Sequence, residues 1–187
     1  MARPEDNMRR SSRSPGRRVL VVDDDAHLHE DYRRCLGPQE IDGGDLRAAR
    51  DALFGATSEG PARAEDSFAI EHALAGEAAL QLVERSLLDA APYCVAFVDM
   101  RMPPGWNGVE TIRRIWAVDP SVQVVLCTAF SDFTWDRVIA EIGRSDGLHL
   151  LRKPFDVDHV RRFAEVLAKK WSLARPGPMR GLAIGAS

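Results

Sequence analysis

The sequence of 187 residues has few cysteines, no long apolar run and no large excess of charge of one sign. Its three cysteines, Cys35, Cys94 and Cys127, lie far apart without CxxC spacing, which excludes a disulfide framework and predicts reduced core thiols in the cytosol. No apolar stretch approaches the roughly 20 residues that span a bilayer. No apolar segment follows the N-terminal arginines as it does in a secretory signal. We therefore expect a cytoplasmic protein without a membrane segment.

The net charge of −3 gives no general attraction to nucleic acid or to anionic membranes. Residues 1–18 carry six arginines against two acids, so this stretch has a charge of +4 and the remainder has −7. We expect residues 1–16 to form a disordered basic tail, with a nucleic-acid-binding arm as the alternative. Residues 172–187, which hold prolines and glycines, are expected to form a flexible C-terminal tail. The folded domain is then residues 17–171.

Within this domain, short apolar runs alternate with amphipathic segments. We predict strands at residues 17–22, 68–73, 93–99, 122–128 and 148–153. We predict helices at residues 26–36, 76–90, 108–118, 133–143 and 156–171. The alternation indicates an α/β domain, namely a doubly wound five-stranded parallel sheet with helices on both faces.

Residues 37–67 do not fit the alternation, because a connection of this length is unusual between a helix and the next strand. The segment LRAARDALF is expected to form a short extra helix. Its inward residues would be Leu46, Ala49, Leu53 and Phe54. The insert is either a decoration or a surface for a partner, and the sequence leaves both open.

Polar side chains follow the predicted strands where these end. They are Asp23, Asp24 and Asp25 after the first, Asp99 at the third, Thr128 at the fourth and Lys153 after the fifth. Because parallel strands share one carboxyl edge, we expect these groups to converge in one cleft. Clustered carboxylates need a cation, and oxygen donors without histidine or cysteine favour Mg²⁺. Lysine and threonine suit phosphoryl oxygens, whereas Asp25 alternatively caps the following helix.

Four motifs occur in order on these elements: VLVVDDD, FVDMRMPPGWNG, VVLCTAF and LLRKPF. Together they resemble the receiver domain of bacterial two-component response regulators over about residues 18–171. The resemblance implies a flavodoxin-like strand order 2-1-3-4-5 and a cis bond between Lys153 and Pro154. It also implies the roles of the site residues: Asp99 as phosphoacceptor, Thr128 and Lys153 as phosphoryl contacts, and Asp23, Asp24, Asp99 and the Arg101 backbone carbonyl as Mg²⁺ ligands.

The function implied is transfer of a phosphoryl group from a histidine kinase or histidine phosphotransfer protein to Asp99. Such a receiver is not an enzyme, although it assists its own phosphorylation and slow dephosphorylation, and it signals through altered protein contacts. The resemblance implies no direct DNA binding, leaves the downstream partner unknown and allows a homodimer. Since few residues follow the last helix, we expect no output domain, and hence a stand-alone receiver or a truncated relative.

Several positions depart from the family pattern. Leu150 stands where the family usually has a Tyr or Phe that changes rotamer on activation. The loop PPGWNG and the connection before Lys153 are longer than usual, and Asn107 replaces a common aspartate as a helix cap. Arg101 and Phe130 are bulky at places that tune access of water to the phosphate. The insert at 37–67 is similar to that of a receiver subgroup in multidomain signalling proteins.

Two other functions remain open at this point. One is a phosphatase of the haloacid dehalogenase type, in which Asp23 is the nucleophile, Asp25 the acid/base and the insert a cap. Against it stand the missing later acidic pair and the position of Lys153 beside a proline. The other is a docking receiver that is never phosphorylated.

Overall fold

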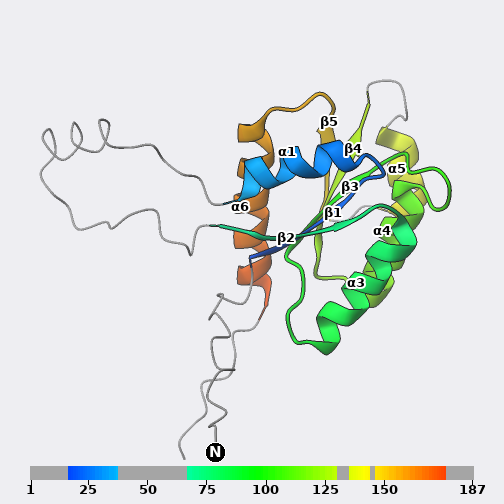
Figure 1. Ribbon diagram of the computed structural model, residues 1–187. Coiled ribbons are helices and arrows are strands. Elements are labelled where there is room, and N and C mark those ends of the chain that lie inside the picture. The colour runs from blue at the N-terminus through cyan, green and yellow to red at the C-terminus, as the bar shows by residue number, and fades with distance from the viewer. Residues whose placement is uncertain (1–16, 38–66, 130–134, 144–145, 176–187) are drawn as a thin grey trace, which may run out of the picture.

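The structure is a computed structural model, and it describes residues 17–37, 67–129, 135–143 and 146–175 (Figure 1). The two expected tails lie mainly outside the described residues, and so do Phe130 and the segment of the insert that we expected to be helical. The five strands are β1 (Arg18–Val22), β2 (Ala69–Ala73), β3 (Val95–Asp99), β4 (Gln123–Thr128) and β5 (Leu148–Arg152). The described helices are α1 (Ala26–Leu36), α3 (Gly76–Leu88), α4 (Gly108–Val118), α5 (Trp135–Ile142) and α6 (Val157–Ala174).

The strands form one parallel sheet in the order β2-β1-β3-β4-β5, which confirms the predicted fold class and strand order. Helices α1 and α6 cover one face of the sheet, and α3, α4 and α5 cover the other (Figure 1). Successive strand residues point to opposite faces. In β3, Val95 and Phe97 therefore join the core under α1 and α6, whereas Ala96 and Val98 join the core under α3 and α4.

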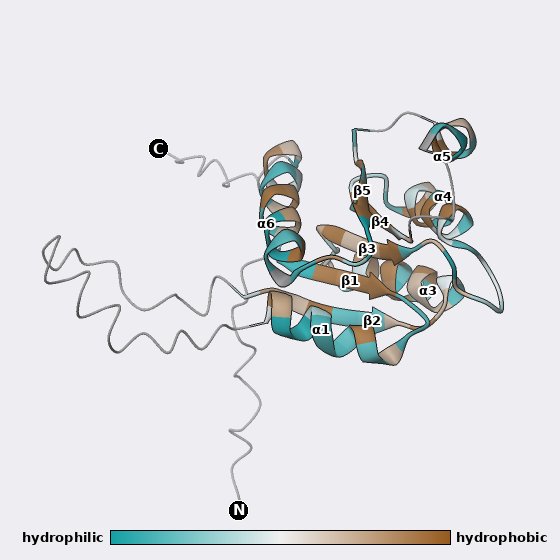
Figure 2. Ribbon diagram, turned by 90° about the horizontal axis from the view of Figure 1, so that it is seen from above, coloured by the Kyte–Doolittle hydropathy of each residue, from teal (hydrophilic) through white to brown (hydrophobic). Residues whose placement is uncertain are grey.

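Both faces of the central strands are buried, which explains why their sequences are continuously apolar rather than alternating. Every residue of β3 and β4 is buried, and the hydrophobic colour concentrates on β1 and β3 between the helix layers (Figure 2). All three cysteines are buried and unpaired, as predicted. Burial raises the pKa of the Cys94 and Cys127 thiols to about 12.

Capping residues explain why two helices have the predicted bounds. The Asp25 carboxylate accepts a hydrogen bond from the His27 amide at 2.9 Å where α1 begins. The Asn107 side chain accepts one from the Glu110 amide at 2.9 Å where α4 begins, so Asn107 serves as the cap we expected.

The bounds of α3, β3 and α6 differ from the prediction by two or three residues, and α3 ends at Leu88 rather than at residue 90. Strand β3 begins at Val95 rather than at residue 93, because the apolar Tyr93 is buried without joining the ladder. Helix α6 continues past residue 171 to Ala174. Nothing in this stretch breaks a helix until Pro176, and a residue that precedes proline, here Arg175, favours an extended backbone.

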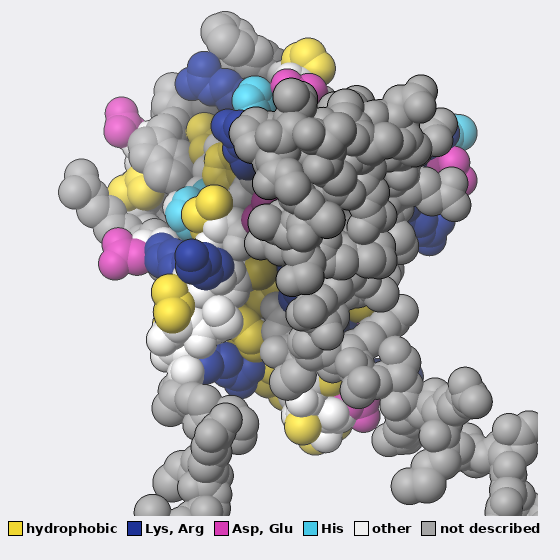
Figure 3. Space-filling view, turned by 90° about the vertical axis from the view of Figure 1, so that its left-hand side faces the viewer, with side chains coloured by type: hydrophobic (Ala, Val, Ile, Leu, Met, Phe, Trp, Pro, Cys, Tyr) yellow, Lys and Arg dark blue, Asp and Glu magenta, His cyan; other side chains and the backbone are white. Residues whose placement is uncertain are grey.

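The surface mixes side chains of all kinds in the part of the chain that the structure describes. On the side seen in Figure 3, hydrophobic side chains lie among basic, acidic and histidine side chains. The exposed large hydrophobic residues include Leu88, Val166 and Leu173; isolated residues of this kind are common on protein surfaces. Within the described ranges, no helix is long and apolar enough to cross a membrane.

Gly108 allows the start of α4 to pack directly on the end of β3. A Cβ atom at this position would lie 2.4 Å from the Asp99 carbonyl oxygen and 3.0 Å from Leu126 Cδ1. The backbones of α4 and β3 can therefore approach this closely only with glycine at position 108.

We expect Gly108→Ala to lower the free energy of unfolding by about 3 kcal/mol, because the start of α4 must move away from β3. This loss outweighs the higher helix propensity of alanine. Urea denaturation measures this loss. Gly143→Ala is the control, since a Cβ there meets no atom within 4 Å and only its φ of +84° is strained; we expect about 1 kcal/mol. Equal losses would contradict the close-packing argument.

Candidate functional site

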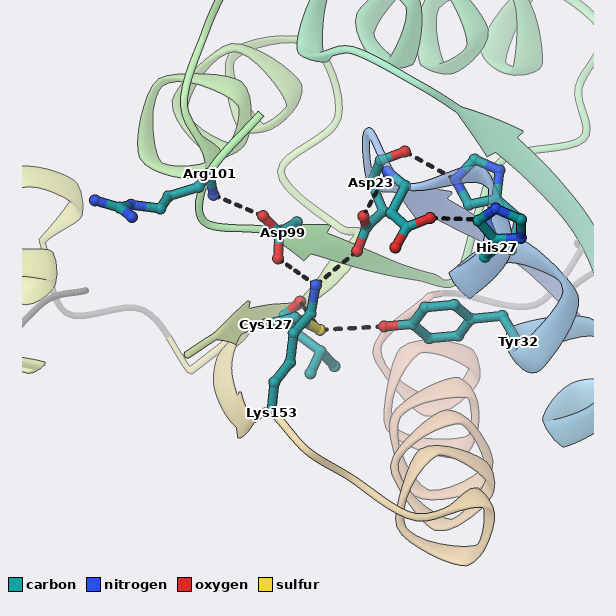
Figure 4. Close-up of polar contacts among 10 residues, drawn as sticks. Asp23, His27, Tyr32, Asp99, Arg101, Cys127 and Lys153 are labelled. Carbon is teal, nitrogen blue, oxygen red and sulfur yellow. Dashed lines mark hydrogen bonds and ion pairs between the residues drawn. The ribbon is translucent and has the colours of Figure 1, made fainter. Parts of the chain in front are cut away.

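Three charged side chains from different strands meet at the carboxyl edge of the sheet (Figure 4). Asp23 follows β1, Asp99 ends β3 and Lys153 follows β5. Lys153 Nζ lies 2.6 Å from Asp99 Oδ1 and 2.8 Å from Asp23 Oδ2, so one ammonium bridges two carboxylates. Strands β1 and β3 are neighbours and β5 lies beyond β4, so the meeting depends on the order of the strands and on the long lysine side chain.

Asp99 is buried, with 8% of its surface exposed. Its Oδ2 accepts a hydrogen bond from the Arg101 amide at 2.7 Å, while Oδ1 faces Lys153. Burial raises the pKa of the Asp99 carboxyl, although Lys153 and the Arg101 amide act in the opposite direction. The carboxylate therefore stands in a place that is poorly solvated but contains two fixed hydrogen-bond donors.

Asp23 is held more tightly still and is only 2% exposed. Its Oδ1 accepts from the Asp25 amide at 3.0 Å, and its Oδ2 accepts from Lys153. Its own amide donates to the Ala73 carbonyl at 3.1 Å, and its carbonyl lies 2.8 Å from His29 Nε2. These contacts fix both the backbone and the side chain of Asp23.

Lys153 is positioned from its backbone as well as from its ammonium. Its amide donates to the Thr128 carbonyl at 2.8 Å, and its bond to Pro154 is cis, as the family resemblance implied. Burial lowers the pKa of the Lys153 ammonium, but the hydrogen bonds and charges of Asp23 and Asp99 outweigh burial, and the pKa is raised. Lys153 therefore stays protonated between the carboxylates.

The structure does not bring every predicted site residue into this cluster. Asp24 is exposed and has no hydrogen bond or ion pair to another described side chain. Thr128 is buried, and its hydroxyl donates to the Ala129 carbonyl at 3.0 Å. The Arg101 amide donates to Asp99, and the metal-ligand role that the family resemblance implied for the Arg101 carbonyl stays a prediction. In the described segments, no three His, Cys, Asp or Glu side chains converge so that they could hold a metal ion.

The unusual positions around the site are accommodated by packing. Leu150 is partly buried against the core under α3, α4 and α5. The loop PPGWNG contains a cis Pro103–Pro104 bond and rests on the start of α3, where a Cβ on Gly105 would lie 3.1 Å from a Glu77 carboxylate oxygen. Arg114 lies over the Trp106 ring, with its guanidinium carbon 4.1 Å from the ring centroid.

Sequence reasoning missed His29. It lies on the buried stripe of α1 that also contains Tyr32 and Leu36. A polar ring at a buried position of a helix next to the acidic motif was the available signal. Its partner His72 on β2 gave no signal of its own, because only the fold brings β2 beside β1.

Comparisons with solved structures agree with the fold, and one curated relative is similar over part of the chain. No family model matches the sequence. The chain is 30% identical over 67 residues to sporulation initiation phosphotransferase F of Bacillus subtilis strain 168, which is 36% of this chain and 51% of that protein. It thus spans about half the length of this curated relative.

Two solved structures share the fold. One is an adenylate cyclase from Rhodopirellula baltica, which is 22% identical in sequence and has a TM-score of 0.58. The match covers 84% of this chain and 91% of that chain. The other is a response regulator receiver domain protein from Methanospirillum hungatei JF-1, with 14% identity, 84% and 97% covered, and a TM-score of 0.57. None of these likenesses bears on the subgroup suggested by the insert.

Proposed function

We propose that this chain, a response-regulator receiver domain by its fold, its motifs and its likeness to a sporulation phosphotransferase, accepts a phosphoryl group on Asp99. The observation that carries the proposal is the environment of Asp99. A buried carboxylate at a strand end faces a lysine ammonium at 2.6 Å and a backbone amide at 2.7 Å. Fixed hydrogen-bond donors around a buried carboxylate suit a side chain whose negative charge increases when it is phosphorylated.

In the proposed reaction, a carboxylate oxygen of Asp99 attacks the phosphorus of a phosphohistidine on a histidine kinase or phosphotransfer protein. The new oxygen–phosphorus bond forms as the phosphorus–nitrogen bond breaks, and the leaving imidazole keeps the electron pair and takes up a proton. The product is an acyl phosphate, which water later hydrolyses. Lys153 holds its positive charge beside the reacting oxygens, and the Arg101 amide orients the carboxylate.

Magnesium is part of the proposal. Asp23, Asp24, Asp99 and the Arg101 carbonyl would hold it, and it would neutralise charge on the phosphoryl oxygens. The donor chemistry supports this assignment, since two buried carboxylates lie within 2.8 Å of a single cation, Lys153 Nζ, and the proposed ligand atoms are all oxygens. Thr128 would contact a phosphoryl oxygen after its hydroxyl turns away from the Ala129 carbonyl. The signal would leave the domain as altered contacts with another protein.

The phosphatase alternative fits the geometry less well. It requires Asp25 as an acid/base, yet the Asp25 carboxylate caps α1 and is exposed. It also requires Asp23 as the nucleophile, but the Asp23 side chain is only 3% exposed, compared with 10% for Asp99.

Acetyl phosphate tests the proposal. The full chain is incubated with acetyl phosphate and Mg²⁺, and the modified peptide is then mapped by mass spectrometry. We expect one phosphoryl group, on Asp99, and no labelling when the Mg²⁺ is chelated. Steady turnover of a phosphate ester that depends on Asp23 would instead support the phosphatase. If acetyl phosphate and a panel of phosphorylated histidine kinases all leave Asp99 unmodified, the docking receiver is the better account.

A further inference from the structure

His29 takes no part in the proposed reaction, but it contacts the turn between β1 and α1 that carries Asp23 and Asp24. It is on the first turns of α1, only 7% exposed, and its Nε2 lies 2.8 Å from the Asp23 carbonyl oxygen. A carbonyl can only accept, so His29 Nε2 carries the hydrogen and donates. This contact joins α1 to the backbone of the turn between β1 and α1.

The contact follows from helix geometry. Helix α1 begins at Ala26, so His29 is about one turn along it. Side chains on a helix lean back toward its N-terminus, which brings the His29 ring over the turn before the helix. The ring then rests on His72 of β2, with centroids 4.5 Å apart and planes 24° from parallel.

His72 stacks against the His29 ring and is itself uncharged. Strand β2 pairs with β1, and His72 is opposite Val21, two residues before Asp23. Both ring nitrogens of His72 are buried and have no hydrogen-bond partner among the described residues. Burial, and then the charges of His29 and Arg33, lower the pKa of His72 to about 4, so the ring is uncharged near neutral pH.

Four contacts hold Asp23, and they differ in kind. Two involve backbone groups that any residue supplies, the Ala73 carbonyl and the Asp25 amide. The third comes from Lys153, which belongs to the site itself. His29 supplies the fourth contact, and unlike Lys153 it makes no hydrogen bond to Asp99 within the described residues. Without it, the buried Asp23 carbonyl would lack this donor, at a cost that favours movement of the turn.

We propose that His29 is a positioning residue for phosphorylation: it anchors the turn that carries Asp23 and Asp24, and so keeps the Asp23 carboxylate at Lys153 beside Asp99. This inference rests on the proposed function, because the placement of the acids matters only if they serve Asp99. His29 acts through the Asp23 carbonyl and not on the phosphoryl group. Removing a group that hydrogen-bonds to a metal-binding residue, without touching the metal itself, typically lowers metal affinity by about 10–100-fold.

Three variants separate the hydrogen bond from packing. His29→Leu removes the donor at similar volume, and His29→Gln keeps an amide donor near the position of Nε2. His27→Leu is the matched control, because His27 is an exposed histidine two residues earlier on the same helix. Mg²⁺ affinity is read from the shift of the Arg101 amide resonance during a Mg²⁺ titration, since this amide donates to Asp99. Urea denaturation of each variant measures folding separately.

We expect His29→Leu to weaken Mg²⁺ binding about 10-fold or more, while His29→Gln and His27→Leu stay within about threefold of the unsubstituted protein. If His29→Leu does not fold, His29→Asn replaces it, because its shorter amide cannot reach the carbonyl. Wild-type affinity in His29→Leu, or equal losses in the Leu and Gln variants, would overturn the inference. A wild-type chain that binds no Mg²⁺ and accepts no phosphoryl group would instead defeat the proposed function, whatever the variants do.

Discussion

Asp99→Asn is expected to abolish phosphorylation by acetyl phosphate and by phosphohistidine donors, with a rate at least about 10³-fold lower. The amide oxygen of asparagine is a poor nucleophile and cannot form the acyl phosphate. The fold should not suffer. Because burial raises the pKa of the Asp99 carboxyl, its ionised form is costly in the folded state. A neutral side chain of the same shape should leave the free energy of unfolding unchanged or raise it by about 1 kcal/mol.

Intact-mass spectrometry after incubation with donor and Mg²⁺ measures the loss, and urea denaturation measures stability. Asp119→Asn is the matched control. Asp119 is also a buried aspartate, but it lies between α4 and β4, where its Oδ1 accepts from the Ser121 amide and hydroxyl. This variant should be phosphorylated at the normal rate. Persistent labelling of Asp99→Asn would place the acceptor elsewhere.

Lys153→Met should have a large effect on stability. It keeps the length of the side chain but leaves Asp23 and Asp99 facing each other without their shared cation. Removing one partner of a buried ion pair lowers the free energy of unfolding by roughly 3–5 kcal/mol. We expect about 3 kcal/mol, because the Lys153 side chain is 23% exposed and solvent weakens the interaction. Phosphotransfer should fall together with stability, since the same ammonium faces the reacting carboxylate.

The stability loss in Lys153→Met should depend on pH in a defined direction. The pKa of Asp99 is already raised, and loss of Lys153, which lowers it, raises it further. A carboxyl whose pKa is higher in the folded state binds more protons there, so its contribution is greatest below the unfolded pKa of about 3.9 and is lost as the pH rises through the folded value. The deficit should therefore be smaller at about pH 5 than at about pH 8.

Urea denaturation at both pH values checks this dependence. The double variant Lys153→Met with Asp99→Asn serves as its control, because it removes one of the two facing charges. It should recover most of the lost stability and lose the extra pH dependence. A deficit of the same size at both pH values would show that lost packing, rather than charge, explains the single variant.

Local sequence signals were sufficient for most of the fold. Apolar runs and amphipathic spacing located all five strands and the helices that the structure describes, and Asp25 and Asn107 marked two helix starts because their side chains cap the first turn. The strand order was implied by the family resemblance rather than by pattern. The start of β3 was less predictable, because Tyr93 and Cys94 are as buried as the strand itself, and hydrophobicity does not distinguish a ladder residue from a buried loop residue.

The candidate site was predictable only in part. Strand-end placement located Asp23, Asp99 and Lys153 at one edge of the sheet, but it could not give the orientation of Asp24 or of the Thr128 hydroxyl, which depends on side-chain rotamers. His29 and His72 required the tertiary structure. Their stacking joins α1 to the edge strand β2, and these two elements are separated by more than thirty residues of sequence.

The contact between Lys153 and Asp23 joins positions 130 residues apart in the sequence. During synthesis, the first strand and both acids emerge long before β5 does. Until that last strand docks, the two carboxylates lack their shared ammonium, and closing so long a loop is slow relative to local folding. If Asp99 is the acceptor, as we propose, a nascent chain can be phosphorylated efficiently only after its final strand has brought Lys153 to the two carboxylates.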